Sequence, residues 1–454
     1  MTTTSPRPDR TAADPATPSA TARLLRPART ATRYALGHGL PALYLARAAR
    51  RGDPVGRLLR DPAAREDPFG LYEQLRARGP LSGSALGPVT ASHAVATAVL
   101  RSDAAGVGWD RSRAPALVRW ALRFGDELDA TGVAEPPSML VTDPPDHTRL
   151  RRLVSRAFTP RATLASEPMV RRTAEALLDR LAGRDDVVDL VGTYAAQLPV
   201  LVIADLLAVP AGRREDFLRW GAAAAATLDP GLPPRRYLAA ERALRAMHAF
   251  LRGHFARLRA DPGEDLVSRL VTLPGDEALT ERELHATVML LLGAGFETTV
   301  NLLGNAVVLL DAHHEQWDAL REDPAGWDGA VEEVLRHDSP VQLTGRSTTR
   351  DTEVAGVALP AGARVTLLLG AANRDPAVFT DPARFDVTRS NAREHLAFSG
   401  GVHYCLGAGL ARLEGVVGLR TLSERFPRLR VAGRPVRRDL RTLRGFEVLP
   451  VRLG

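Results

Sequence analysis

The chain contains 454 residues, of which 45% are hydrophobic, a fraction that is ordinary for a folded protein with a large core. The formal net charge is +7, but all 60 basic residues are arginines distributed along the chain, so the composition does not indicate a nucleic-acid-binding protein. The single cysteine excludes a disulfide bond within the chain and fits a reducing compartment, so we expect a cytoplasmic protein.

The N-terminal region differs in composition from the rest of the chain. Residues 1–30 contain mainly Thr, Pro, Ala, Ser and Arg, so we expect a disordered tail. No apolar run long enough for a signal peptide follows the first arginines. Residues 31–65 form an extension with some helical amphipathicity, which we expect to pack against the protein rather than to bind a membrane or a partner. The main domain is then expected over residues 66–454.

The first half of that domain predicts a mainly helical structure. Apolar residues recur at helical spacing over residues 69–78, 95–100, 117–124, 164–181, 190–207, 213–227 and 237–258. A further helix is expected to begin after Asp143-Pro144-Pro145. Short strands are expected over residues 81–90, and later over 348–354 and 364–369 around a hairpin turn at Leu359-Pro360-Ala361-Gly362. The sequence therefore predicts small sheets beside a large set of helices.

A long helix is expected from Thr280 to about residue 310, because Glu283 lies three residues after Thr280 and completes a capping box. Its middle part, residues 290–303, is apolar on nearly every face, which indicates burial in a large protein or in a membrane. A membrane span is excluded because Glu297 and Thr298 lie within that part, where each would be costly in lipid. A buried helix that carries such polar groups suggests function, although a kink stabilised by threonine hydroxyls is the alternative.

The only cysteine, Cys405, lies between Phe398 and Gly407. A lone cysteine is most often a small buried hydrophobic residue. Here, however, Gly400, Gly401 and Gly407 indicate a tight loop, and apolar residues at helical spacing begin at residue 408. Loop amides and the dipole of that helix would stabilise a thiolate, which is the form that an axial ligand of haem iron requires.

This loop resembles the haem-binding loop of the cytochrome P450 family. The positions that match the family pattern in register are Phe398, Gly401, His403, Cys405 and Gly407. Ser399 departs from it, since the family most often has glycine there. The resemblance implies that the cofactor is haem b (iron protoporphyrin IX), that Cys405 is the iron ligand, and that the other matched residues bind the cofactor.

The polar cluster of the long helix resembles the oxygen-activation motif of the same family. The resemblance implies that Ala294 and Gly295 leave room for a ligand, that Thr298 offers a hydroxyl to dioxygen, and that Glu297 passes protons inward. Phe296 stands where a histidine or another polar residue is common, so we expect it to narrow the pocket or to make its wall more apolar.

Three further motifs match the family. His147 and Arg151 lie four residues apart on one helix face and match its propionate-binding pair, although alone they could be part of a solvated basic helix. Arg346 matches another propionate-binding arginine, and His403 is expected to join these three. Glu333-Val334-Leu335-Arg336 matches a Glu-x-x-Arg motif whose charged residues form a buried structural pair behind the haem.

The matches run in the order of the family from about residue 66 to the end. They imply a single mainly α domain with small β-sheets, in which the haem lies between the long central helix and the cysteine loop. The implied activity is monooxygenation: dioxygen and electrons are used to hydroxylate, epoxidise or oxidatively couple a small, largely apolar organic substrate, such as one of secondary metabolism.

The sequence contains no glycine-rich flavin or nicotinamide fingerprint, so the electrons are expected from a ferredoxin-type donor with its reductase. The expected docking residues are Arg149, Arg152, Arg156 and Arg412, unless these are ordinary solvated arginines.

Two other haem proteins remain as alternatives, a peroxide-dependent peroxygenase and a non-catalytic haem sensor or carrier. The pair Glu297-Thr298 argues against both, because neither needs a proton relay. Without the resemblance, the alternative is a soluble helical binding protein with a buried cysteine.

Overall fold

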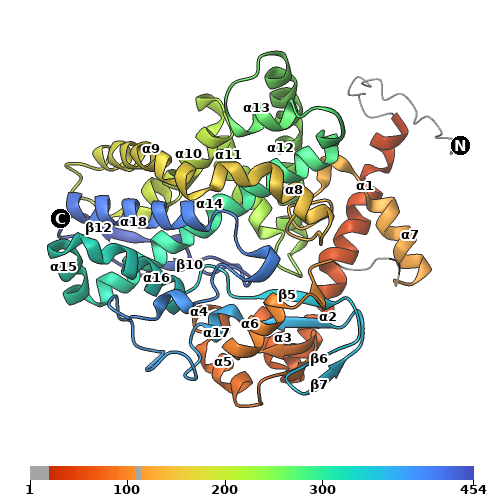
Figure 1. The fold of residues 1–454 in the computed structure, drawn as a ribbon, viewed down its shortest axis with the longest axis horizontal. Coiled ribbons are helices and arrows are strands. Elements are labelled where there is room, and N and C mark those ends of the chain that lie inside the picture. The colour runs from red at the N-terminus through yellow and green to blue at the C-terminus, as the bar shows by residue number, and fades with distance from the viewer. Residues whose placement is uncertain (1–19, 109–111, 113) are drawn as a thin grey trace, which may run out of the picture.

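The structure is a computed structural model that describes residues 20–108, 112 and 114–454, and helices form most of it (Figure 1). The α-helices are α1 (Ala20–Tyr34), α2 (Leu40–Arg50), α3 (Pro54–Arg60), α4 (Pro62–Glu66), α5 (Phe69–Arg76), α6 (His93–Arg101), α7 (Ala116–Gly125), α8 (Asp146–Ser155), α9 (Pro160–Asp179), α10 (Gln197–Leu206), α11 (Arg214–Ala226), α12 (Pro234–Ala260), α13 (Leu266–Val271), α14 (Glu281–Ala312), α15 (His314–Glu322), α16 (Trp327–His337), α17 (Leu369–Ala372) and α18 (Ala408–Arg425). Two π-helical turns are η1 (Ala35–Gly39) and η5 (Val191–Ala195). The mainly helical fold with small sheets is confirmed.

Short strands complete the fold: β1 (Ser82–Ser84), β2 (Gly87–Thr90), β3 (Ala105–Gly106), β4 (Val188–Asp189), β5 (Thr344–Thr348), β6 (Thr352–Val354), β7 (Val357–Leu359), β8 (Arg364–Leu367), β9 (Arg430–Val431), β10 (Val436–Arg437), β11 (Phe446–Val448) and β12 (Pro450–Arg452). The largest sheet has the order β1-β2-β8-β5-β3, and only its β2–β8 pair is parallel. Smaller sheets are formed by β4-β12-β9, β10-β11 and β6-β7.

The hairpin was expected at the wrong turn. The tight turn lies between β6 and β7, where Ala355 and Gly356 have φ angles of 52° and 79°. Two consecutive left-handed residues match the twist of a two-residue hairpin. Leu359-Pro360-Ala361-Gly362 instead connects this hairpin to β8, which pairs with β5. The prediction was wrong because Pro360 and Gly362 form a stronger turn signal in the sequence than Ala355 and Gly356 do.

Helix α14 runs through the middle of the molecule (Figure 1). Its capping box is present, because the Thr280 side chain accepts from the Glu283 amide and the Glu283 side chain accepts from the Thr280 amide. Among the described residues it is the one helix long and apolar enough to cross a membrane, but 83% of its most apolar window is buried inside the fold. It packs against α10, α11 and α18, so its all-round apolar character reflects a position in the core.

The N-terminal boundary differs from the expected one. Residues 20–30, which were expected in a disordered tail, belong to helix α1, while residues 1–19 lie outside the described residues. Helix α1 continues through η1 into α2, and it lies beside α7 at the edge of the molecule (Figure 1). Arg33 holds helix α1 against the rest of the protein, because its guanidinium is 2.9 Å from the Glu135 carboxylate and also donates to the Ala130 carbonyl. Composition could not show this long-range contact.

Candidate active site

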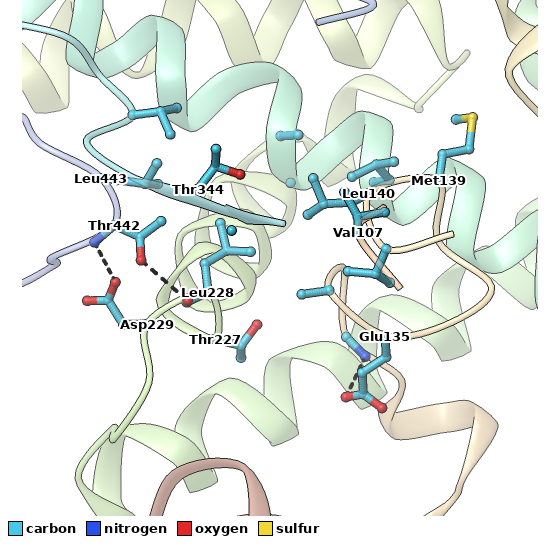
Figure 2. A pocket seen from close by; sticks show the side chains of 18 of the residues that line it. Val107, Glu135, Met139, Leu140, Thr227, Leu228, Asp229, Thr344, Thr442 and Leu443 are labelled. Atoms are coloured by element: carbon cyan, nitrogen blue, oxygen red, sulfur yellow. Dashed lines mark hydrogen bonds between the residues drawn. The ribbon is translucent and has the colours of Figure 1, made fainter. Parts of the chain in front are cut away.

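A cavity of about 1010 Å³ lies between α14 and the loop before α18. Figure 2 shows part of its wall, with Val107, Met139 and Leu140 on one side and Thr344 and Leu443 on the other. Leu228 also lines it (Figure 2). The cavity is mainly apolar and large enough for a cofactor together with a small organic molecule.

The cysteine loop is shaped by close backbone approaches. A Cβ atom on Gly401, which has a φ of 65°, would lie 2.1 Å from the Leu100 carbonyl oxygen of α6, so only glycine fits there. Ser399 also has a positive φ, 63°, which explains why glycine is more usual at this position. The Cys405 amide donates to the Phe398 carbonyl at 2.9 Å and closes the loop.

Cys405 faces the cavity. Its side chain has accessible surface because it lines that space, although protein encloses it on the remaining sides. Burial raises the pKa of the Cys405 thiol, while the Gly407 amide, Arg151 and Arg412 act in the opposite direction. A stable thiolate therefore needs a further positive charge in the cavity, which a metal ion would supply.

The four predicted propionate-binding residues, His147, Arg151, Arg346 and His403, all line this cavity. The rings of the two histidines lie 4.3 Å apart between centroids, and the His147 Nδ1 atom has no hydrogen-bond partner. Burial lowers the pKa of both histidines, for His403 to about 4.

Arg346 is a buried cation without an ion pair to any carboxylate of the described residues. Its Nη2 donates to Ser399 Oγ at 3.2 Å and its Nη1 to the Gly345 carbonyl at 2.9 Å. Burial lowers the pKa of Arg346 to about 10, and only Asp143 opposes this through its charge. A buried guanidinium in this state favours an anionic ligand, as a haem propionate would be. The residues present therefore fit a haem.

The polar cluster of α14 divides between two faces. Ala294, Gly295 and Thr298 line the cavity, and Thr298 Oγ1 donates to the Ala294 carbonyl at 3.0 Å. Glu297 does not line the cavity; its side chain is buried behind α14, with Oε1 2.8 Å from Arg438 Nη1. Burial raises the pKa of Glu297, and Arg438 opposes that change.

The expectation that Phe296 narrows the pocket or makes its wall more apolar is wrong. Phe296 packs against α11, where a Cβ atom on Gly221 would lie 1.9 Å from its ring. Gly221 therefore leaves the space for this ring, away from the cavity. Adjacent residues on a helix point in different directions, so the side chains of Phe296 and Glu297 contact different neighbours. The sequence motif gives the residue types but not the direction of each side chain.

Two residues of the site were not found from the sequence. Glu414 of α18 lines the cavity beside Thr299, and burial raises the pKa of its carboxyl group to about 8. An acidic residue within the otherwise apolar stretch 413–419 was a signal that could have identified it. Arg438, the partner of Glu297, gave no signal, because it follows a short strand far along the chain.

The surface that we expected to bind the redox partner carries less net positive charge than the arginines in the sequence indicated, because most of them are paired with acidic residues. Arg149 forms an ion pair with Glu283, Arg152 Nη2 lies 3.0 Å from Glu277, and Arg412 Nε lies 2.6 Å from Glu332. Arg156 is exposed and has no ion pair among the described residues.

Comparison with known proteins identifies the family. A model of the family "Cytochrome P450" matches residues 327–443. The chain is 48% identical over 423 residues to "Putative cytochrome P450 140" of Mycobacterium tuberculosis, and the match covers 92% of this chain and 96% of that relative. The chain belongs to the cytochrome P450 family. Cytochromes P450 are monooxygenases that bind haem b through a cysteine thiolate, so the expected enzyme class and cofactor are confirmed.

Other relatives are bacterial cytochromes P450 too. The chain is 42% identical over 321 residues to the 6-deoxyerythronolide B hydroxylase of Saccharopolyspora erythraea, covering 70% of this chain and 78% of that enzyme. The ligand-free structure of CYP164A2 from Mycobacterium smegmatis has a TM-score of 0.79 at 39% identity, over 88% of this chain and 99% of that one. The structure of P450BioI with a fatty-acid-loaded acyl carrier protein has a TM-score of 0.78 at 35% identity, over 86% and 100%.

Proposed function

We propose that this cytochrome P450 oxidises a small, largely apolar organic molecule of secondary metabolism, with Cys405 as the iron ligand. The observation that carries the proposal is that the only cysteine faces a mainly apolar cavity of about 1010 Å³ whose wall includes Ala294, Gly295 and Thr298 of α14. When bound, the haem supplies reductive activation of dioxygen, by which one oxygen atom enters the substrate and the other leaves as water.

The residues of the cysteine loop and its surroundings bind the cofactor in this proposal. Phe398, Gly401 and Gly407 set the course of the loop, so that the sulfur atom of Cys405 is presented to the cavity. His147, Arg151, Arg346 and His403 hold the two propionates, because all four line the cavity, the two histidine rings lie 4.3 Å apart, and each histidine senses the charge of one of the two arginines. Charge-assisted hydrogen bonds of this kind are about twice as strong as neutral ones.

The electron donor is proposed to be a small ferredoxin-type protein with its reductase. Arg156 is the member of the expected docking surface that keeps an exposed charge without an acidic neighbour, so it is the first contact that we assign to this partner. The absorption spectrum of the reduced protein with carbon monoxide, followed by turnover with a ferredoxin system, tests the proposal as a whole. A spectrum without thiolate ligation would refute it.

Replacing both Arg151 and Arg346 with glutamine should weaken haem retention. Each lost charge-assisted hydrogen bond costs roughly 1.5–3 kcal/mol, so haem should transfer to apomyoglobin at least about tenfold faster than from the unchanged protein. The control is Arg156→Gln, which makes the same type of substitution at an exposed arginine outside the cavity and removes one positive charge. If the double variant retained haem as firmly as this control, the propionate assignment would be wrong.

Thr298→Ala should uncouple the reaction. In the proposal the Thr298 hydroxyl holds a proton at the cavity wall, and Glu297, which must turn away from Arg438, resupplies it. Without the hydroxyl, dioxygen consumption continues while product falls and hydrogen peroxide rises, by about 10²-fold or more in the ratio of peroxide to product.

The control for this prediction is Thr298→Ser, which keeps the hydroxyl and should keep most of the coupling. Equal coupling in the alanine variant and the unchanged enzyme would remove Thr298 from proton transfer. If product formation driven by hydrogen peroxide alone then matched the rate with reductase, the peroxygenase alternative would replace the proposal.

A further inference from the structure

The N-terminal helices present an exposed apolar stripe. The outward apolar positions along α1, η1 and α2 follow helical spacing, and they are Leu24, Ala28, Ala31, Ala35, Leu40 and Leu43. The wider turn of η1 moves the stripe forward by one residue, so that it continues from α1 onto α2 without a break. Leu24, Leu40, Leu43 and Tyr44 are 81%, 58%, 69% and 53% exposed.

Helix α7 extends this stripe sideways. It packs beside α1 (Figure 1), and Arg29 of α1 lies over the ring of Phe124 at 5.8 Å. On its outer side Leu117 and Trp120 are 74% and 61% exposed. Other exposed large apolar residues lie singly or in pairs on separate elements, such as Leu164 on α9 and the paired Val436 and Val448 on β10 and β11. Single exposed residues are normal, whereas a continuous group of this size marks an interaction surface.

The same region carries the whole net charge of the protein. Residues 20–51 contain seven of the 60 arginines and none of the 53 acidic residues, so the remainder of the chain contains 53 of each sign. Arg47, Arg50 and Arg51 are exposed and form no ion pair with any described residue. Arg119 and Arg123 add exposed charge on α7. The arginines are distributed along the whole chain, so the positive charge of this region results from its lack of acidic residues.

The inner sides of these helices belong to the active site. Arg33, Leu36 and His38 line the cavity from α1 and η1. Val118 and Leu122 line it from α7. A single layer of helices thus separates the substrate cavity from the exposed apolar stripe, so an occupant of the outer surface lies within one helix diameter of the cavity.

We propose that the outer sides of α1, η1, α2 and α7 bind the surface of an anionic lipid bilayer. Exposed leucines, a tryptophan and a tyrosine suit the boundary between headgroups and acyl chains, and arginines around them suit lipid phosphates. An acidic protein would satisfy the arginines but would leave the leucines of the stripe without a comparable apolar partner. The surface goes beyond the proposed oxidation and serves to place the cavity wall against a lipid phase, in which largely apolar molecules concentrate.

Vesicle sedimentation of the haem-loaded full-length protein tests this proposal. Vesicles of phosphatidylcholine with a third phosphatidylglycerol should bind the protein, whereas vesicles of phosphatidylcholine alone should bind it at least tenfold more weakly. Leu43→Ser/Trp120→Ser should reduce binding about tenfold by removing the apolar contacts. Arg47→Gln/Arg50→Gln/Arg51→Gln should reduce it by at least tenfold and flatten its dependence on salt.

Leu164→Ser/Val436→Ser is the matched control, because it removes exposed apolar side chains outside the stripe and should leave binding unchanged. The carbon monoxide spectrum of each variant checks that the haem site is intact, and it separates this test from that of the oxidation itself. Absence of binding to anionic vesicles overturns the proposal, as does equal loss in the control. The proposal is also overturned if the protein forms a dimer in light scattering, or a complex with a small acidic protein, instead of binding vesicles, and if Leu43→Ser/Trp120→Ser abolishes that dimer or complex.

Discussion

Cys405→Ser should eliminate the thiolate signature of the reduced carbon monoxide complex and reduce monooxygenase activity by several orders of magnitude. Serine has almost the size of cysteine, so the loop can keep the hydrogen bond of 2.9 Å between the amide of residue 405 and the Phe398 carbonyl. A hydroxyl group does not ionise near neutral pH and cannot supply the strongly donating ligand that the chemistry requires. The loss is therefore expected in a protein that still folds.

The cysteine also predicts a pH dependence of haem binding. Burial raises the pKa of the thiol in the haem-free protein, so this group holds its proton well above neutral pH. Ferric haem must displace that proton when it binds, so haem affinity should rise by about tenfold per pH unit as long as the pH is below the pKa of the thiol. The same raised pKa destabilises the haem-free fold at high pH, since the unfolded chain releases the proton more easily.

The measurements are the reduced carbon monoxide spectrum and haem titrations between pH 6 and 9, with far-ultraviolet circular dichroism as the check on folding. The serine variant should show neither the thiolate band nor the proton-linked slope. If it retained the thiolate band, Cys405 would not be the iron ligand. A slope that is the same in both proteins would assign the released proton to another group.

The cysteine loop could be identified from the sequence because its signal is local. The Cys405 amide bonds back to the Phe398 carbonyl within the loop, and the loop glycines belong to the same short motif, so nearby residues carry this signal. The close approach that requires glycine at residue 401 is to Leu100 of α6, which is distant in the sequence and was not predicted. The capping box at Thr280 and the buried α14 were predicted for the same reason.

The missed features depend on residues that are distant in the sequence. Glu297 faces Arg438 rather than the cavity, and Phe296 fills the space that Gly221 leaves. A motif gives the residue types on a helix, but the elements that pack around the helix decide which side chain reaches which neighbour. Helix α1 was missed in the same way, since its contact with Glu135 is invisible to composition.

A second large effect is expected on stability, from the Glu-x-x-Arg motif of α16. Glu333 and Arg336 are both fully buried, with Arg336 Nε 2.7 Å from Glu333 Oε2 and Nη2 2.8 Å from Oε1. Arg336 also donates to the carbonyl groups of Asn373, Pro382 and Arg384. The pair thereby fixes the irregular segment that leads to the cysteine loop.

Glu333→Gln should lower the free energy of unfolding by about 3–5 kcal/mol. The substitution leaves the buried guanidinium of Arg336 without its anion, and an uncompensated buried charge is far more costly than the loss of an exposed pair. Arg389 loses its carboxylate as well, since its Nε lies 3.2 Å from Glu333. Urea unfolding of the haem-loaded protein, followed by circular dichroism, measures the change.

The matched control is the exposed pair on α18, where Arg420 Nε lies 2.7 Å from Glu424 and the side chains are 39% and 50% exposed. Glu424→Gln should change the free energy of unfolding by no more than about 0.5 kcal/mol. The double variant Glu333→Gln/Arg336→Met should lose less than the sum of its two single substitutions, because the buried guanidinium of Arg336 is then removed together with its anion, and only Arg389 still loses its carboxylate. If Glu333→Gln cost as little as Glu424→Gln, or if the two losses simply added, the buried pair would not hold the segment before the cysteine loop.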